Sequence, residues 1–179
     1  MLKKTAFTLY ELIIVLAIVS ILSAVAIPAC QSWIMQGRRD AVIYQLYHAL
    51  FLARSSAIRY RAIVTICPSR DGYDCDMIWN QGYMVITGNP ERPERILKVF
   101  SPRSGTLSWH GYPQSPYLQM TAQGFTNHQN GTFYYCPANQ DPHFAKALFV
   151  IQSGRVRLSQ DKDHDGIDED SEGKPLHCF

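Results

Sequence analysis

The chain has 179 residues, of which 46% are hydrophobic and 12% aromatic. This composition suits one folded domain with an N-terminal anchor and excludes a globally disordered chain. The formal net charge is only +2, but seven of the 15 acidic residues and one of the 17 basic residues lie in residues 161–172. A basic body therefore carries one acidic loop, which suggests an anionic partner for the body or a cation for the loop more than a uniform surface. Ordinary solvated charge is the alternative, and a modest charge excess alone favours it.

The N-terminus begins with a short positive segment that is followed by an apolar run. Lys3 and Lys4 precede residues 12–27, which carry no charge and approach the roughly 20 apolar residues that cross a bilayer. The lysines predict that the N-terminus stays cytoplasmic while the rest is exported. An ordinary secretory signal, cleaved near residues 24–26, is the alternative. Glu11 argues against it, because a carboxylate at the start of an apolar span is costly and needs a partner.

Residues 5–18 resemble the class III leader and first helix of type IV pilins and pseudopilins. The resemblance implies that a prepilin peptidase cuts between Ala6 and Phe7 and that the new N-terminus is methylated. It also implies that Glu11 pairs with the N-terminal amine of a neighbouring pilin. The family usually has glycine where this chain has Ala6, and alanine is the next smallest residue, so we still expect cleavage.

A second helical pattern follows the apolar run. Pro28 ends the run and predicts a kink or break, and the helical pattern resumes after Gly37. Apolar residues then recur at three- and four-residue spacing, which is typical of one buried stripe on a water-exposed helix. The stripe consists of Val42, Ile43, Leu46, Ala49, Leu50, Ala53, Ala57 and Ile58.

From residue 62 onward the pattern changes to strands and turns. Strands are predicted at residues 63–66, 83–86, 96–100, 132–135 and 147–151, with turns at 71–72, 88–90, 130–131 and 153–154. The result is an α+β fold, a type IV pilin-like long N-terminal helix packed on an antiparallel sheet. The predicted parts are a leader (1–6), a transmembrane half of the helix (7–28), an amphipathic half (29–61) and a β-rich periplasmic domain (62–179).

Five cysteines favour two disulfides in an oxidising compartment. Cys30 lies in the apolar stem, and the other four lie in the polar part, where they allow three pairings. Cys67 and Cys75 would close a short loop, and Cys136 and Cys178 would then tie the tail to the sheet. Zinc is the competing explanation for a cysteine set, but no CxxC pair or histidine spacing supports it.

The segments after the membrane resemble FimT/GspH-like minor pilins and pseudopilins. The resemblance lies in residues 53–58, 64–69, 79–83, 131–136 and 153–157. In FimT-like proteins linked to natural transformation, a GRxR motif near the C-terminus binds DNA, and residues 154–157 match it. The resemblance therefore implies that Gly154, Arg155 and Arg157 bind DNA.

The residue types of this motif suit contact with phosphates. On an extended segment Arg155 and Arg157 project to the same side, and Gly154 frees the backbone for a sharp bend. Two guanidinium groups can hold successive phosphates without reading bases, so we expect non-specific, salt-sensitive binding. Lys146 and the arginines of residues 54–61 would extend the patch. A solvated edge strand without a ligand is the alternative.

The acidic loop, residues 161–172, fits the spacing of an EF-hand calcium loop. Calcium needs several oxygens around one point, with a glycine for the sharp turn at Gly166. The predicted ligands are Asp161, Asp163, Asp165, the Ile167 carbonyl, Glu169 and Glu172. The flanks are not helical as in an EF-hand, so the alternative is an acidic, flexible tail. Calcium would have a structural role in ordering the tail.

The sequence predicts a minor pilin rather than an enzyme, because no nucleophile elbow, metal-ligand catalytic motif or phosphate loop is found. We expect a single-pass protein of the bacterial inner membrane, with its C-terminal domain in the periplasm, that enters the pilus on assembly. Its expected partners are other pilins, prepilin peptidase, the membrane and DNA. The alternatives are a structural minor pilin that primes assembly without binding DNA, and a GspH-like pseudopilin of type II secretion.

Overall fold

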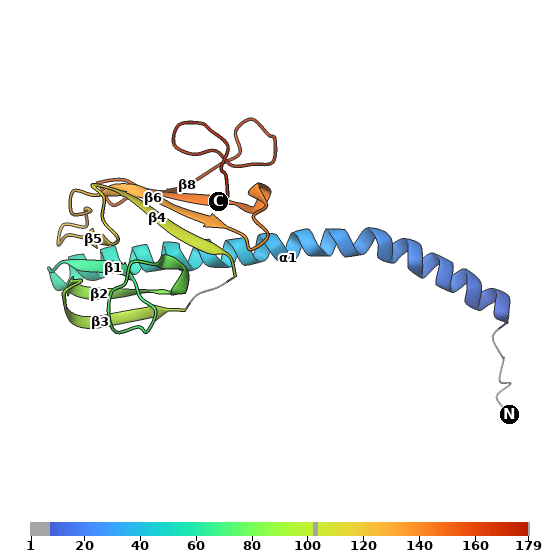
Figure 1. Cartoon of the computed structure of the whole chain (residues 1–179), viewed down its shortest axis with the longest axis horizontal. Helices are drawn as coiled ribbons and strands as arrows, with labels where there is room; N and C mark the ends of the chain where they lie inside the picture. The colour runs from blue at the N-terminus through green and yellow to red at the C-terminus, as the bar shows by residue number, and fades with distance from the viewer. Residues whose placement is uncertain (1–7, 102–103, 179) are drawn as a thin grey trace, which may run out of the picture. The chain divides into compact units, whose positions relative to one another are not determined.

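The computed structural model describes residues 8–101 and 104–178, except for the side chain of Pro28. One long helix precedes eight strands (Figure 1). In chain order the elements are α1 (Leu9–Tyr60), β1 (Val64–Pro68), the short helix η1 (Trp79–Gln81), β2 (Tyr83–Asn89), β3 (Arg92–Phe100), β4 (Thr106–Tyr112), β5 (Leu118–Met120), β6 (Asn130–Cys136), the short helix η2 (Pro142–Phe144), β7 (Lys146–Val150) and β8 (Val156–Leu158). The chain forms two compact units, divided between Gly37 and Arg38. The predicted α+β fold is confirmed.

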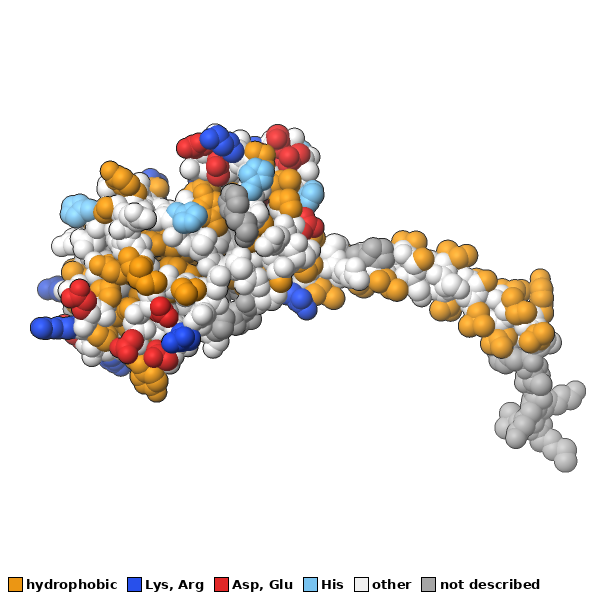
Figure 2. Space-filling model, viewed as in Figure 1, with side chains coloured by type: hydrophobic (Ala, Val, Ile, Leu, Met, Phe, Trp, Pro, Cys, Tyr) orange, Lys and Arg blue, Asp and Glu red, His pale blue; other side chains and the backbone are white. Residues whose placement is uncertain are grey.

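Helix α1 is continuous over 52 residues, so the predicted break between position 28 and Gly37 is wrong. A proline removes one helical hydrogen bond, but the bonds that form on both sides of position 28 keep the helix propagating. The first part of α1 is long and apolar enough to cross a membrane by length and composition. Its large side chains, including Leu16 and Leu22, are exposed, and Figure 2 shows hydrophobic groups along this segment.

The second part of α1 packs within the C-terminal unit through the predicted stripe. Seven of the eight stripe residues are buried, from Val42 to Ala57. Ile58 is the exception and remains 49% exposed. It lies at the border of the buried face, where its side chain would contact any Cβ added at Gly124.

The strands form two four-stranded antiparallel sheets rather than one. The first has the order β3-β2-β1-β5 and the second the order β4-β6-β7-β8. Strand β4 leaves its sequence neighbour β3 and pairs with β6 along all seven of its residues, from Thr106 opposite Cys136 to Tyr112 opposite Asn130. This pairing is non-local, and it separates the two halves of the domain into layers that share one core with α1.

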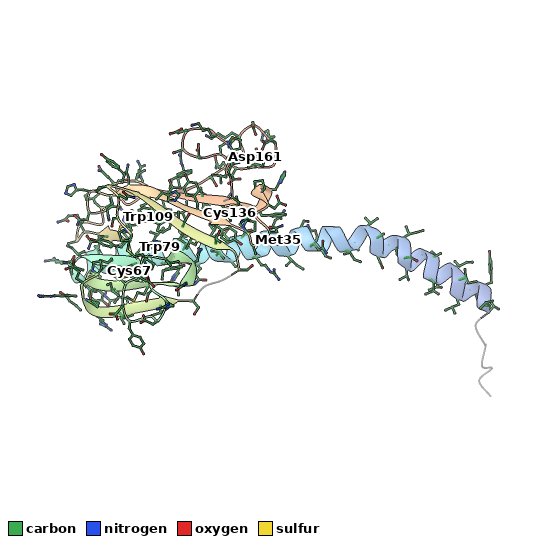
Figure 3. All side chains as sticks on the ribbon, viewed as in Figure 1. Met35, Cys67, Trp79, Trp109, Cys136 and Asp161 are labelled. Carbon is green, nitrogen blue, oxygen red and sulfur yellow. A yellow bond between two sulfur atoms is a disulfide. The ribbon has the colours of Figure 1, made fainter. Side chains whose placement is uncertain are left out.

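Aromatic side chains fill the core between the sheets (Figure 3). The ring of Phe133 on β6 lies 4.9 Å from that of Trp79 and 4.4 Å from that of Trp109, measured between centroids. The Trp79 indole N–H donates to the Pro116 carbonyl over 3.0 Å, which satisfies its one polar atom. These contacts bind η1, β4 and β6 into one unit.

The turn predicted at residues 130–131 is wrong, because both residues begin strand β6. Gly131 pairs with Gly111 of β4 and with Val150 of β7. A Cβ at Gly131 would come within 2.4 Å of the His110 carbonyl oxygen and 2.6 Å of the Trp109 ring. Here glycine makes room for a tryptophan on the neighbouring strand and does not mark a turn.

Two disulfides close loops in the C-terminal unit, Cys67–Cys75 and Cys136–Cys178. The second ties the tail to the end of β6, where Leu176 is buried against Ala147 and Phe149. Cys30 is a free, exposed cysteine.

Candidate functional site

The N-terminal sites fall partly outside the described residues, since Ala6 and Phe7 are not among them. Glu11 is described, and it forms a capping box with Thr8. The Thr8 backbone N–H and hydroxyl donate to Glu11 Oε2 over 2.9 and 3.0 Å, and the Glu11 N–H donates to the Thr8 hydroxyl over 3.3 Å. Sequence reasoning missed this role, although Thr-x-x-Glu before an apolar run is its known signal.

The GRxR motif spans the end of the turn from β7 and the first two residues of β8. Gly154 has φ 72°, a left-handed conformation that favours glycine. A Cβ there would lie 2.4 Å from the Gly124 carbonyl oxygen. From the helix, Arg54 Nη1 donates to the Gly154 carbonyl over 2.9 Å. Two segments distant in sequence, at Arg54 and Gly124, therefore approach Gly154, and packing alone requires a glycine at this position.

Arg155 and Arg157 are both exposed, and Val156 between them is half-buried against the core. Arg155 Nε donates to the Ser153 hydroxyl over 3.4 Å, and the Arg157 guanidinium lies 5.2 Å from the centroid of the Phe149 ring. Over the described ranges, no carboxylate forms a salt bridge with either arginine or with Arg54. The positive charge at this turn is therefore available to an external anion.

Lys146, unlike these arginines, is paired with an acidic side chain. Its ammonium lies 2.6 Å from Asp168 Oδ2, and the two side chains are only 19% and 13% exposed. The Ser159 hydroxyl donates to the same carboxylate. Lys146 thus fastens the tail to β7. Of the predicted extensions of the patch, Arg54 lies beside the motif. The sequence predicts both residues as part of the patch, and only the contacts between distant segments separate them.

Three of the predicted calcium ligands gather in the acidic loop (Figure 3, at Asp161). One ligand atom from each of Asp161, Asp163 and Glu169 lies within 4.8 Å of the others. Glu169 is 6% exposed and accepts two hydrogen bonds of 3.0 Å from the Lys162 N–H and one of 3.3 Å from the Asp163 N–H. Oxygens bound to one calcium ion lie at most about 5 Å apart, so this spacing is compatible with the ion.

Asp165 and Glu172, which were also predicted as ligands, form other contacts. Asp165 Oδ1 accepts the Ile167 N–H over 2.8 Å. Lys174 Nζ donates a hydrogen bond to Glu172 Oε2 over 2.7 Å. This hydrogen bond raises the pKa of Lys174. Burial raises the pKa of the Asp170 carboxyl. The hydrogen bonds that this carboxyl accepts from the backbone N–H groups of Lys174 and Glu172 lower the pKa, and the net shift is downward. Residues 170–174 thus form a turn of their own, and Glu172 is not part of the cluster of Asp161, Asp163 and Glu169.

Comparisons with known proteins agree with this fold. A family model described as Type II transport protein GspH matches residues 43–161. Fimbrial protein EcpB of Eikenella corrodens is 39% identical over 108 residues, which cover 60% of this chain and 64% of EcpB. The matched part is thus less than two thirds of that relative's length.

Two solved structures are similar in fold. The type IV minor pilin FimU of Pseudomonas aeruginosa has a TM-score of 0.57 at 22% identity, over 83% of this chain and 98% of FimU. The minor pseudopilin EpsH of the Vibrio cholerae type 2 secretion system has a TM-score of 0.51 at 13% identity, over 68% of this chain and 95% of EpsH. At such identities the likeness concerns the fold alone. Since the family model matches more than half of the chain, the chain belongs to the GspH-like family of type IV minor pilins and pseudopilins.

Proposed function

We propose that this protein is a minor type IV pilin that binds DNA non-specifically through Arg155 and Arg157 during natural transformation. In this proposal prepilin peptidase cleaves before Phe7, and Glu11 directs assembly with other pilins. The protein is held in the inner membrane by the first part of α1, with its C-terminal unit in the periplasm, until it enters the pilus. Membership of the family implies assembly with other pilins.

One observation carries the DNA-binding proposal. Arg155 and Arg157 are exposed on one short segment, Arg54 lies beside them, and none of the three forms a salt bridge within the described part of the chain. Guanidinium groups without acidic partners suit phosphates, which they contact with two parallel hydrogen bonds. The likeness to EpsH and the name of the family model keep the pseudopilin as the second candidate.

A salt titration of duplex DNA binding tests the proposal. The full-length protein in a neutral detergent is expected to bind unrelated duplexes with equal affinity, because the arginines contact phosphates and not base edges. Each phosphate contact contributes about 0.9 to the slope of log affinity against log salt. Fluorescence anisotropy at several salt concentrations measures that slope. Absence of binding at low salt would leave the structural pilin or pseudopilin as the function.

We further propose that Asp161, Asp163 and Glu169 bind calcium as a structural ion. Calcium would neutralise three neighbouring carboxylates and order the tail between β8 and Cys178. At a concentration of a hundred times the dissociation constant, it is expected to stabilise the fold by about 2.7 kcal/mol.

Thermal melting with calcium and with a chelator measures this effect. The double variant Asp161→Asn/Asp163→Asn is expected to lose the response to calcium. The matched control Glu172→Gln is expected to keep it, since Glu172 lies in the neighbouring turn with Lys174. An equal loss in both variants would mean that the loop rearranges into an EF-hand arrangement, against the proposed ligand set.

A further inference from the structure

A groove lies directly beside the GRxR motif, between α1 and the turn from β7 to β8. Its helix side consists of Tyr47, Leu50, Phe51 and Arg54, and its other side of residues 154–156. Its volume is about 230 Å³. Pockets for drug-sized ligands have volumes of about 300–1,000 Å³, so this groove suits one planar ring system rather than a larger molecule.

The helix wall of the groove is aromatic and open to solvent. Tyr47, Phe51 and Arg54 are spaced by four and three residues, which places them on one face of α1. Tyr47 is 48% exposed and Phe51 is 64% exposed, whereas Leu50 beneath them is buried. Exposed aromatic faces on a rigid helix provide stacking surfaces whose position does not depend on the ligand.

The charge of the groove selects for an anion that carries an aromatic group. Arg54 and Arg155 line it, and no lining residue is acidic. Arg157 follows two residues after Arg155, within β8. A purely apolar occupant would cover the guanidinium groups without replacing the hydrogen bonds that they make to water, which costs free energy. A nucleotide satisfies both features, because its base stacks on aromatic rings while its phosphate meets arginine.

We infer that this groove holds one unpaired nucleobase, so the protein binds single-stranded DNA, or the frayed end of a duplex, by stacking on Phe51 and Tyr47. The inference rests on the proposed DNA binding and adds the form of DNA recognised. The phosphates next to the stacked base lie on Arg155 and Arg157. Blunt duplex DNA, whose bases are paired, uses the arginines alone.

The test compares a labelled oligothymidine strand with a blunt duplex by fluorescence anisotropy, using the full-length protein in neutral detergent. Phe51→Ala is expected to weaken single-strand binding at least about fivefold, the lower end of the effect of losing one base–aromatic stack. Duplex affinity is expected to stay unchanged. Phe51→Leu keeps the apolar bulk but removes the aromatic face, so it is expected to lose the same single-strand affinity. The matched control is Tyr44→Ala, since Tyr44 is 70% exposed on the same helix but does not line the groove.

Several results would overturn the inference and leave the arginine proposal standing. They are equal losses for Phe51→Ala and Tyr44→Ala, full single-strand binding by Phe51→Leu, and equal losses for single strand and duplex. A fourth is unchanged DNA affinity with weaker association of Phe51→Ala with other pilins, which would identify a neighbouring pilin as the occupant. If the unaltered protein binds neither form of DNA, the proposed function itself fails.

Discussion

Replacing Phe133 with alanine is expected to lower the free energy of unfolding by about 3–5 kcal/mol. Phe133 is fully buried in the middle of β6, which pairs with β4 on one side and with β7 on the other. Its ring contacts the rings of Trp79 and Trp109, so truncation leaves a cavity where three elements meet. Rigid aromatic neighbours cannot collapse fully into that space.

Thermal unfolding followed by tryptophan fluorescence measures the effect in the full-length protein. For a chain of this size the loss corresponds to a fall in melting temperature of about 6–20 °C. The matched control is Phe125→Ala, because Phe125 is 52% exposed and its loss creates no cavity. Surface changes of that kind usually stay within about 0.5 kcal/mol. Equal shifts in the two variants would mean that the aromatic cluster is not the centre of the core.

The long helix and the central strands were predictable because local patterns specify them. Apolar spacing from Val42 to Ala57 marks the buried face of α1, and β-branched and aromatic runs mark β1, β2, β6 and β7. Strand β4 was missed, since its sequence contains glycine, serine and histidine and it pairs with a distant strand. Asn130 and Gly131 resemble a hairpin turn, but they pair with the distant strand β4, where Gly131 leaves room for the Trp109 ring.

The candidate sites were predictable to the extent that one short segment contains them. Arg155, just before β8, and Arg157 within it are both exposed on either side of the half-buried Val156, as expected, because extended-chain periodicity is a local property. The pairing of Lys146 with Asp168 and the approach of Arg54 to Gly154 depend on contacts between distant segments. Glu172 was assigned from loop spacing, and its carboxylate forms an exposed ion pair with Lys174 that the spacing does not predict.

The double variant Arg155→Ala/Arg157→Ala is expected to reduce the affinity for duplex DNA at least tenfold. Hydrogen bonds to charged groups contribute about 1.5–3 kcal/mol each where water is partly excluded, and a tenfold change needs about 1.4 kcal/mol. Both arginines are exposed to solvent, which reduces the binding free energy that each hydrogen bond contributes. We therefore expect a loss of at least tenfold rather than the larger loss that the full values would give. The slope of log affinity against log salt is expected to fall by about 1.8, because two phosphate contacts are lost.

The matched control is Arg92→Ala/Arg95→Ala. Both arginines are exposed on β3, in the other sheet, and their removal changes the net charge by the same amount. This control separates a local phosphate site from a general attraction between a basic protein and DNA. It is expected to retain most of the affinity and the full salt slope.

The most direct measurement is therefore the salt dependence of duplex DNA binding for the unaltered protein and these two double variants side by side. Loss of affinity and of about two phosphate contacts in Arg155→Ala/Arg157→Ala alone is the expected result. Equal behaviour of the two variants, or no binding by the unaltered protein, would contradict a DNA-binding role for the turn between β7 and β8.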